Sequence, residues 1–255
     1  MRRAFIFPPL FSVALLLLAI SAAAAERCAP PPDLKPKLTA TPSVETLNDL
    51  GVWFAQHDEF TCAAQAFASS LETDLQQPDL PRIVFEFGAA LFFSGDTAGS
   101  ITALQQAETL GYRDLKLHEM LATALDAQHS TQDAIEEWRK ALTFDPDAAL
   151  QLDSLSTDLI AVHQYQQAVD LLEQPRVRPY RTVTQYLNLG AALVELGHPE
   201  SAANTLEDGL NTYPSSAKLA HQLAAVLTSL HRDDDAALVL RLATEEQTDP
   251  AQPSE

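Results

Sequence analysis

The sequence predicts an all-α protein, a solenoid of about six repeated helix pairs. Apolar residues recur in the same order every 34 residues through most of the chain. Within each period, many apolar positions lie three or four residues apart, a spacing that places them on one side of a helix. Alanine and leucine are abundant and only 8 of the 255 residues are glycine, a composition that favours helices over sheets. A repeating helix pair is therefore expected along the chain.

The first 25 residues are predicted to be a secretory signal peptide. Arg2 and Arg3 provide a basic start, residues 4–20 are uncharged and apolar, and a run of alanines ends at Ala25. We expect cleavage after Ala25 and an exported protein, periplasmic or secreted. The alternative is an uncleaved segment that anchors the protein to the membrane, because about 20 apolar residues can span a bilayer.

Residues 26–42 form a Pro-rich extension ahead of the first helix pair. The extension contains Cys28, and the other cysteine of the sequence is Cys62. In an oxidising compartment, a disulfide between them would attach the extension to the first helices. Two unrelated thiols are the alternative, and the sequence leaves both open. Neither cysteine has a histidine at the spacing typical of metal ligands, so the sequence predicts no metal site.

Two columns of small residues, one in each helix of a pair, define the repeat. The first column is Gly51, Gly88, Ala122, Ser156, Gly190 and Ala224. The second column, twelve residues further on, is Ala63, Ser100, Ala134, Ala168, Ala202 and Ala236. Large apolar residues stand directly before and three after each member of the first column, and four after each member of the second. We therefore expect the two helices to cross closely at the small residues, with bulky side chains interdigitating on either side.

Polar turns and prolines between the columns place the pairs in chain order. The expected pairs span 43–73, 80–110, 114–143, 147–174, 181–212 and 215–247, followed by a disordered tail at 248–255. In the fourth pair, Pro175 should end the second helix early and leave a loop before the fifth pair. Five histidines fall in the turns inside the pairs, where a left-handed backbone is expected to be tolerated.

Two segments carry the repeat most clearly, "YLNLGAALVELGHPESAANTLEDGLNTYP" and "LATALDAQHSTQDAIEEWRKALTFDP". With Leu-Gly in the first segment and Leu-Ala in the second, each followed by Ala and Pro in this order, they resemble the tetratricopeptide repeat, and the resemblance covers Ser43 to Glu246. It implies a right-handed superhelix whose concave groove is lined by the first helix of each pair and binds peptides or proteins.

The composition restricts the function to few classes. A formal net charge of −19 disfavours binding to nucleic acid. The sequence also contains no phosphate-binding glycine loop, nucleophile elbow or HExxH motif. We therefore expect a non-enzymatic scaffold without a cofactor that binds a protein or peptide partner in the cell envelope. The alternative is a small-ligand or glycan-binding accessory subunit of an envelope complex.

The groove columns of the resembled family supply the first set of candidate contact residues. Carried over to this sequence, they include Arg82, Phe85, Phe92, Phe93, Lys116, Glu119 and Asn188. The phenylalanines of "VFEFGAALFF" cannot all lie on one helix face. They are therefore expected either to pack in the core or to anchor apolar side chains of a partner.

Two further surfaces are candidate contacts. The loop after Pro175 carries Arg176, Arg178 and Arg181, which are expected either to pair with nearby carboxylates or to dock an anionic group of a partner. In the last helix, an apolar edge would mediate self-association or the docking of another protein. Its residues are Leu238, Val239 and Leu242.

Overall fold

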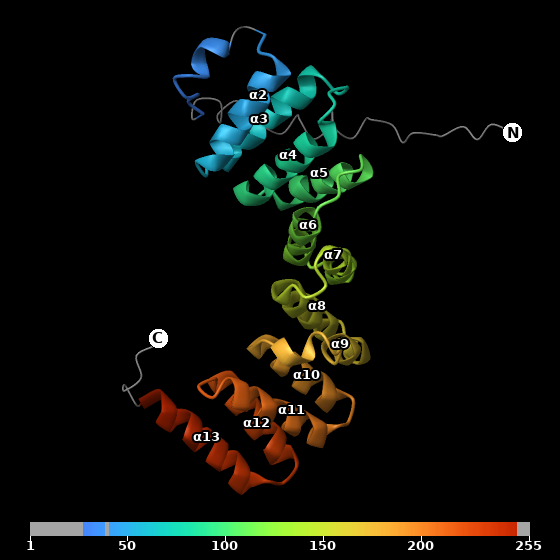
Figure 1. The fold of residues 1–255 in the computed structure, drawn as a ribbon, viewed down its shortest axis with the longest axis vertical. Coiled ribbons are helices and arrows are strands. Elements are labelled where there is room, and N and C mark those ends of the chain that lie inside the picture. Colours follow the sequence, from blue (N-terminus) through green and yellow to red (C-terminus); the bar gives the residue numbers. More distant parts are fainter. Residues whose placement is uncertain (1–27, 39–40, 249–255) are drawn as a thin grey trace, which may run out of the picture. The chain divides into compact units, whose positions relative to one another are not determined.

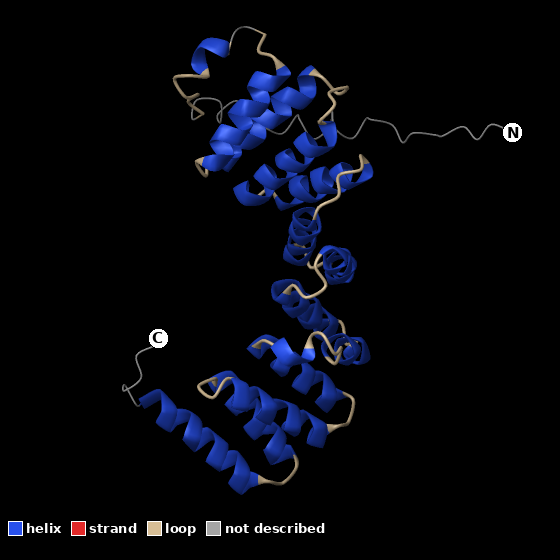
Figure 2. Ribbon diagram, in the orientation of Figure 1, coloured by secondary structure: helices blue, strands red, loops and turns tan. Residues whose placement is uncertain are grey.

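The computed structural model describes residues 28–38 and 41–248, and the regular structure of these residues is entirely helical (Figure 2). The all-α solenoid of helix pairs predicted from the sequence is confirmed. None of the described helices is long and apolar enough to cross a membrane. The predicted signal peptide at 1–25, and residues 249–255 of the predicted tail, lie outside the described residues.

The described part of the chain consists of two compact units, one up to His129 and the other from Ser130 onward. The N-terminal unit contains α2 (Val44–Gln56), α3 (Phe60–Thr73), α4 (Leu80–Ser94), α5 (Thr97–Thr109) and α6 (Leu115–Ala127). The C-terminal unit contains α7 (Thr131–Phe144), α8 (Ala149–Ala161), α9 (Tyr165–Leu172), α10 (Val183–Glu195), α11 (Pro199–Thr212), α12 (Ala217–Ser229) and α13 (Asp233–Thr248). Figure 1 labels these helices along the chain.

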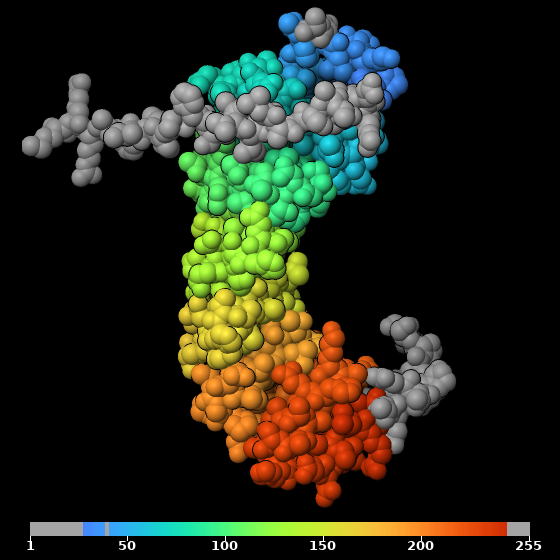
Figure 3. Space-filling model, turned by 180° about the vertical axis from the view of Figure 1, so that it is seen from behind, coloured from blue at the N-terminus to red at the C-terminus, as the bar shows by residue number. Residues whose placement is uncertain are grey.

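Within each unit, every helix packs against the next one in sequence (Figure 1). The first helices of neighbouring pairs also contact one another directly, α4 with α6 in the N-terminal unit, and α8 with α10 and α10 with α12 in the C-terminal unit. The colours of the space-filling view show the same sequential order of pairs within each unit (Figure 3). The first helices therefore form a continuous layer within a unit, and side chains on that layer come from consecutive pairs.

The glycines of the first column lie where two helices cross, as the sequence predicts. A Cβ atom on Gly51 would lie 2.7 Å from the ring of Phe67, and one on Gly190 would lie 3.0 Å from Leu206. Gly88 faces Leu104 in the same way, at 3.0 Å. We expected Ala202 to meet Gly190 from the second helix. The nearest atoms instead belong to Leu206, one helical turn further on, so the glycine makes room for a leucine.

The turn inside each pair places one residue in the left-handed region. The residues at this position are Asp58, Gly95, His129, His163, Gly197 and His231, with φ between 60° and 87° in this set. In five of these turns, all but the one at His129, the next amide N–H donates to a carbonyl five residues back, for example Asp96 N to Leu91 O and Arg232 N to Leu227 O. Three of the five turn histidines thus occupy the left-handed position, whereas His57 and His198 lie beside it. The left-handed backbone therefore explains three of the five turn histidines, His129, His163 and His231.

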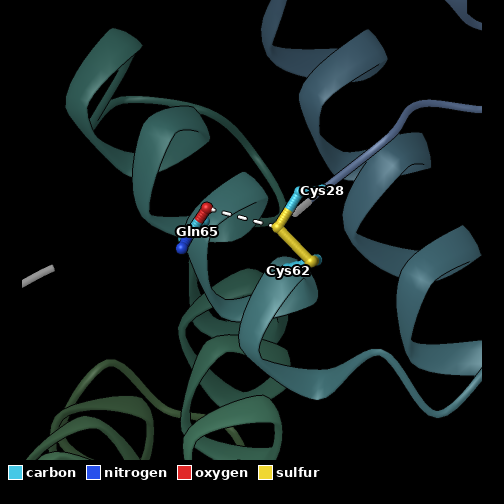
Figure 4. The surroundings of a disulfide bond; sticks show 3 residues. All are labelled: Cys28, Cys62 and Gln65. Carbon is cyan, nitrogen blue, oxygen red and sulfur yellow. Dashed lines mark hydrogen bonds between the residues drawn. A yellow bond between two sulfur atoms is a disulfide. The ribbon is translucent and has the colours of Figure 1, made fainter. Parts of the chain in front are cut away.

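The Pro-rich extension is attached to the first helix pair at two points. Cys28 and Cys62 form a disulfide with their Cα atoms 5.4 Å apart (Figure 4). Leu34, which precedes the short 3₁₀ helix η2 (Lys35–Lys37), is only 7% exposed and joins the core of the N-terminal unit. Residues 28–38 of the extension are therefore part of the folded unit.

Gln65 lies beside this disulfide (Figure 4). Its Oε1 atom is 3.4 Å from Cys28 Sγ, while its Nε2 atom is buried and has no hydrogen-bond partner among the described residues. A disulfide sulfur has no hydrogen to donate, so it can only accept a bond from the amide nitrogen. Exchanging the positions of Oε1 and Nε2 would satisfy the buried donor, and we assign Gln65 that orientation.

The fourth pair departs from the others in the expected way. Its second helix, α9, has only 8 residues and ends at Leu172, ahead of Pro175. The chain then forms a loop with a short 3₁₀ helix, η3 (Arg178–Tyr180), before α10 begins. Residues that would continue α9 in a regular pair are thus displayed on a loop.

Candidate functional site

The N-terminal unit contains an apolar hollow of about 410 Å³ on the layer of first helices. Helices α2, α4 and α6 each contribute to its wall, and Phe60 and Phe67 of α3 complete it. The side chains of Ala55 and Ala89 are too small to fill the hollow, and the larger side chains of Phe85 and Met120 form part of its wall. Three consecutive pairs therefore build one concave apolar site, the form that ligand and peptide pockets generally take.

The aromatic residues around the hollow differ in their roles. Phe93 is 54% exposed and stacks on Phe60, with the ring centroids 4.9 Å apart. Phe85 is half-buried in the wall and stacks on Tyr112 at 4.5 Å. Phe92 is half-buried beside Phe93, in an edge-to-face contact at 5.3 Å. Phe93 is thus the open ring of the set, whereas Phe85 and Phe92 are half-buried beside neighbouring rings.

The charged groups near the hollow are paired with each other. Arg82 donates to Glu86 at 2.6 Å and to Asp79 at 3.4 Å. Burial by itself would lower the pKa of the Arg82 guanidinium, but its bonds to Glu86 and Asp79 outweigh burial and raise it. Lys116, in the wall of the hollow, pairs with Glu119 at 2.8 Å. Of the two basic residues in the predicted groove set, Arg82 and Lys116, only Lys116 lines the hollow itself.

Tyr112 contacts the hollow indirectly, through its stacking on Phe85 of the wall. Burial raises the pKa of its phenol above the ordinary value, and the carboxylates of Asp114 and Glu86 act in the same direction. The phenol therefore stays protonated and neutral across the physiological pH range. The stacked pair of Phe85 and Tyr112 is an uncharged wall for the site.

No protein-family model and no curated protein matches the sequence. Among solved structures, a tetratricopeptide repeat protein from Parabacteroides merdae matches with a TM-score of 0.62 and 13% identity, over 83% of this chain and 81% of that one. The chain has the tetratricopeptide-repeat fold. A MamA protein matches with a TM-score of 0.59 and 19% identity, over 70% of this chain and 100% of its own. A MamA double mutant gives 0.57 and 17%, over 68% and 97%. At these identities the likeness concerns the fold.

Within this tetratricopeptide-repeat fold, the predicted contact residue Asn188 joins two helices. Its amide donates to Ser156 Oγ at 2.8 Å and to Thr157 Oγ1 at 3.0 Å, which links α10 to α8. Gln185, one turn earlier, donates to Asp153 at 2.6 Å and is only 1% exposed. Asn188 is therefore committed to packing between the first helices, and we correct its assignment as a contact for a partner.

The three arginines of the loop after Pro175 in this tetratricopeptide-repeat chain also differ in their contacts. Arg181 is 6% exposed and donates to the Leu172 carbonyl at 2.8 Å and to Glu173 at 2.6 Å. It thereby satisfies the end of the shortened α9, so its assignment as a docking residue is corrected. Arg176 is exposed and pairs with Asp147 at 3.4 Å, and Arg178 is exposed on η3. Pairing with nearby carboxylates therefore holds for Arg176 and Arg181, while Arg178 is exposed.

A second hollow, also of about 410 Å³, lies beside this loop in the C-terminal unit. Leu142, Leu155 and Leu171 line it together with Arg139 and Arg176. The leucines beneath it are largely buried already, with Leu155 at 2% exposure, and Arg139 is bonded to Gln167 at 2.6 Å. This hollow offers little free apolar surface and is the weaker candidate.

The predicted apolar edge of the last helix is only partly open. Leu238 and Leu242 are 43% and 50% exposed, whereas Val239 packs against the core of the C-terminal unit. Val239 is therefore removed from the candidate surface.

Several residues that line the hollow were not predicted from the sequence, among them Val52, Ala55, Phe60, Ala89 and Met120. Small or apolar residues at these positions have no pattern that distinguishes them from core residues.

Proposed function

We propose that this chain is an exported protein-interaction scaffold that holds an apolar side chain of a protein or peptide partner in the hollow of α2, α3, α4 and α6. The observation that carries the proposal is the exposed Phe93 ring, stacked on Phe60 at the mouth of an apolar hollow of about 410 Å³. A large exposed aromatic ring next to an unfilled apolar site is typical of the centre of a protein interface.

The composition of the wall favours a peptide over a glycan. Apolar side chains dominate it, and a glycan would need many hydrogen-bonding groups that these side chains lack. Lys116 adds one cationic group at the wall, and its own side chain is 63% exposed. An exposed ion pair such as Lys116–Glu119 contributes about 1 kcal/mol or less, so Lys116 can exchange it for a carboxylate of the partner. We therefore expect a bulky apolar residue of the partner to lie close to an acidic one.

Export is the second part of the proposal and is supported by two features. The N-terminal 25 residues have the composition of a signal peptide, and the disulfide joins the extension directly after them to the first pair. We expect the intact mass of the protein purified from its native envelope to match a chain that begins at Glu26 and lacks two hydrogens through the disulfide. A chain that retains residues 1–25, or has free thiols, would contradict export with cleavage.

The hollow predicts a specific loss of binding. Changing Phe93 to alanine is expected to reduce capture of the partner at least tenfold, about 1.4 kcal/mol, because the exposed ring is available to bury against it. Capture is measured by photo-crosslinking from a crosslinker placed at Ala89 in the wall, in a native envelope extract. The captured protein is then identified by mass spectrometry.

The matched control is Phe144→Ala, because Phe144 of α7 is also a half-exposed phenylalanine, at 45%, but belongs to the C-terminal unit. This variant should capture the partner like the unchanged protein. Equal capture by the Phe93 variant would show that the hollow is not the site. A large drop in its melting temperature would show instead that Phe93 is a core residue.

A further inference from the structure

The second helix of the last pair differs from the other five at two positions. Counted from the small residue of the second column, these positions lie two and six residues further on. In the first five pairs they hold polar residues, namely Gln65 and Ser69, Thr102 and Gln106, Glu136 and Lys140, Asp170 and Gln174, and Asn204 and Asp208. In the sixth pair they hold Leu238 and Leu242. The repeat keeps these positions polar wherever else it occurs in this chain.

These two leucines lie on a face of α13 that its own unit does not use. Ala236 and Ala243 are buried at 5% and 7% exposure, so they mark the face that packs on the core. Leu238 and Leu242, four residues apart, share another face and are 43% and 50% exposed. Their side chains therefore add little to the stability of α13 by burial, and an exposed apolar pair on an otherwise polar column indicates a binding surface.

The charge next to this pair indicates what covers it. In the first turn of α13, Asp234 and Asp235 lie four and three residues before Leu238 and share its side of the helix, whereas Asp233 lies five residues before it and does not. Asp235 pairs with Arg232 at 2.7 Å, and among the described residues no ion pair is recorded for Asp233 or Asp234. A second copy of this chain would bring the same aspartates and the same net charge of −19 to the interface, so repulsion opposes self-association.

We propose that the outward face of α13 docks a basic amphipathic helix of a partner protein. Apolar residues four apart on that helix would cover Leu238 and Leu242, and lysine or arginine next to them would meet the aspartates of the first turn. This surface lies in the C-terminal unit, whereas the hollow belongs to the N-terminal unit. The proposal is therefore independent of the function assigned to the hollow.

The test uses the full chain and two synthetic helical peptides of the same apolar pattern. Both carry leucines four residues apart, and one has flanking lysines where the other has glutamates. We expect the lysine peptide to bind in a titration calorimeter or by fluorescence anisotropy, and the glutamate peptide not to bind. The double variant L238N/L242D, which installs the residues of the fifth pair at these positions, should weaken binding of the lysine peptide at least tenfold.

The double variant separates specific docking from general attraction to an acidic protein. It adds one negative charge, so non-specific attraction of the lysine peptide would be kept or strengthened, and a loss of binding reports on the leucines. N204A/D208A on α11 is the matched control and should bind like the unchanged chain.

Three results would overturn the proposal. Unchanged binding by L238N/L242D would show that the leucines take no part. A dimer of the unchanged chain in sedimentation that this variant converts to a monomer would make a second copy the occupant. A clear fall in its melting temperature would show that the leucines stabilise the fold itself.

Discussion

Loss of the disulfide is expected to lower the free energy of unfolding of the first helix pair by about 4 kcal/mol, because the bond closes a loop of 34 residues and restricts the unfolded chain. Changing Cys28 to serine removes the bond at its half-buried end and leaves Cys62 in the core. The fluorescence of Trp53 in α2 reports on this pair when Trp138, the second tryptophan, is replaced by phenylalanine. The measurement is denaturant unfolding followed through Trp53.

Reduction of the unchanged protein is the control for this substitution. It should shift the Trp53 transition by the same amount as Cys28→Ser, and reductant should have no further effect on the variant. A transition that neither the substitution nor reductant moves would show that the extension contributes nothing through this bond. Leu34 would then hold the extension in place by burial.

A leucine in place of Gly190 is expected to lower the free energy of unfolding of the C-terminal unit by about 3 kcal/mol. Even a Cβ atom would lie 3.0 Å from Leu206, so a full side chain forces α10 and α11 apart. Changing Leu206, which is fully buried, to alanine should cost about 2 to 5 kcal/mol through the cavity it leaves. Denaturant unfolding followed by circular dichroism measures both effects.

The two changes are expected to compensate in part when combined. The new side chain at position 190 can enter the space that Leu206 vacates, so the double variant should be more stable than the sum of the single losses by about 0.5 to 3 kcal/mol. Ser201→Leu, on an exposed position of α11, is the control for adding a leucine and should change stability little. Strict additivity of the two losses would contradict the close crossing of α10 and α11.

The columns show why so much of the fold could be predicted from one sequence. A small residue is required wherever two helix backbones approach, and a left-handed turn recurs at the same place in each pair. Both requirements recur in every copy, at intervals of 34 residues after a first interval of 37, so six copies reinforce one pattern that a single copy would leave ambiguous. The early end of α9 follows equally directly from Pro175, whose ring cannot continue a helix.

The candidate site was predictable only in part. The aromatic residues of α4 stood out because they exceed what one helix face can bury, and Phe85 and Phe93 do line the hollow. Phe60 did not stand out, since a single phenylalanine after a turn has no periodic signal, yet it stacks on Phe93. Which apolar residues of three separate helices leave a space between them depends on how those helices pack.

The sequence by itself determined the repeated helix pairs, the glycine crossings and the left-handed turns, because each of these recurs at the same place in several copies of the repeat. Only the tertiary structure decided which individual polar and apolar side chains are buried and which are exposed. Arg181 and Arg178 are three residues apart, but one is buried against Leu172 and Glu173 while the other is exposed. Leu238 and Val239 are adjacent, but only Leu238 faces outward. Exposure depends on the surface of the neighbouring helix, and residue type and spacing do not specify that surface.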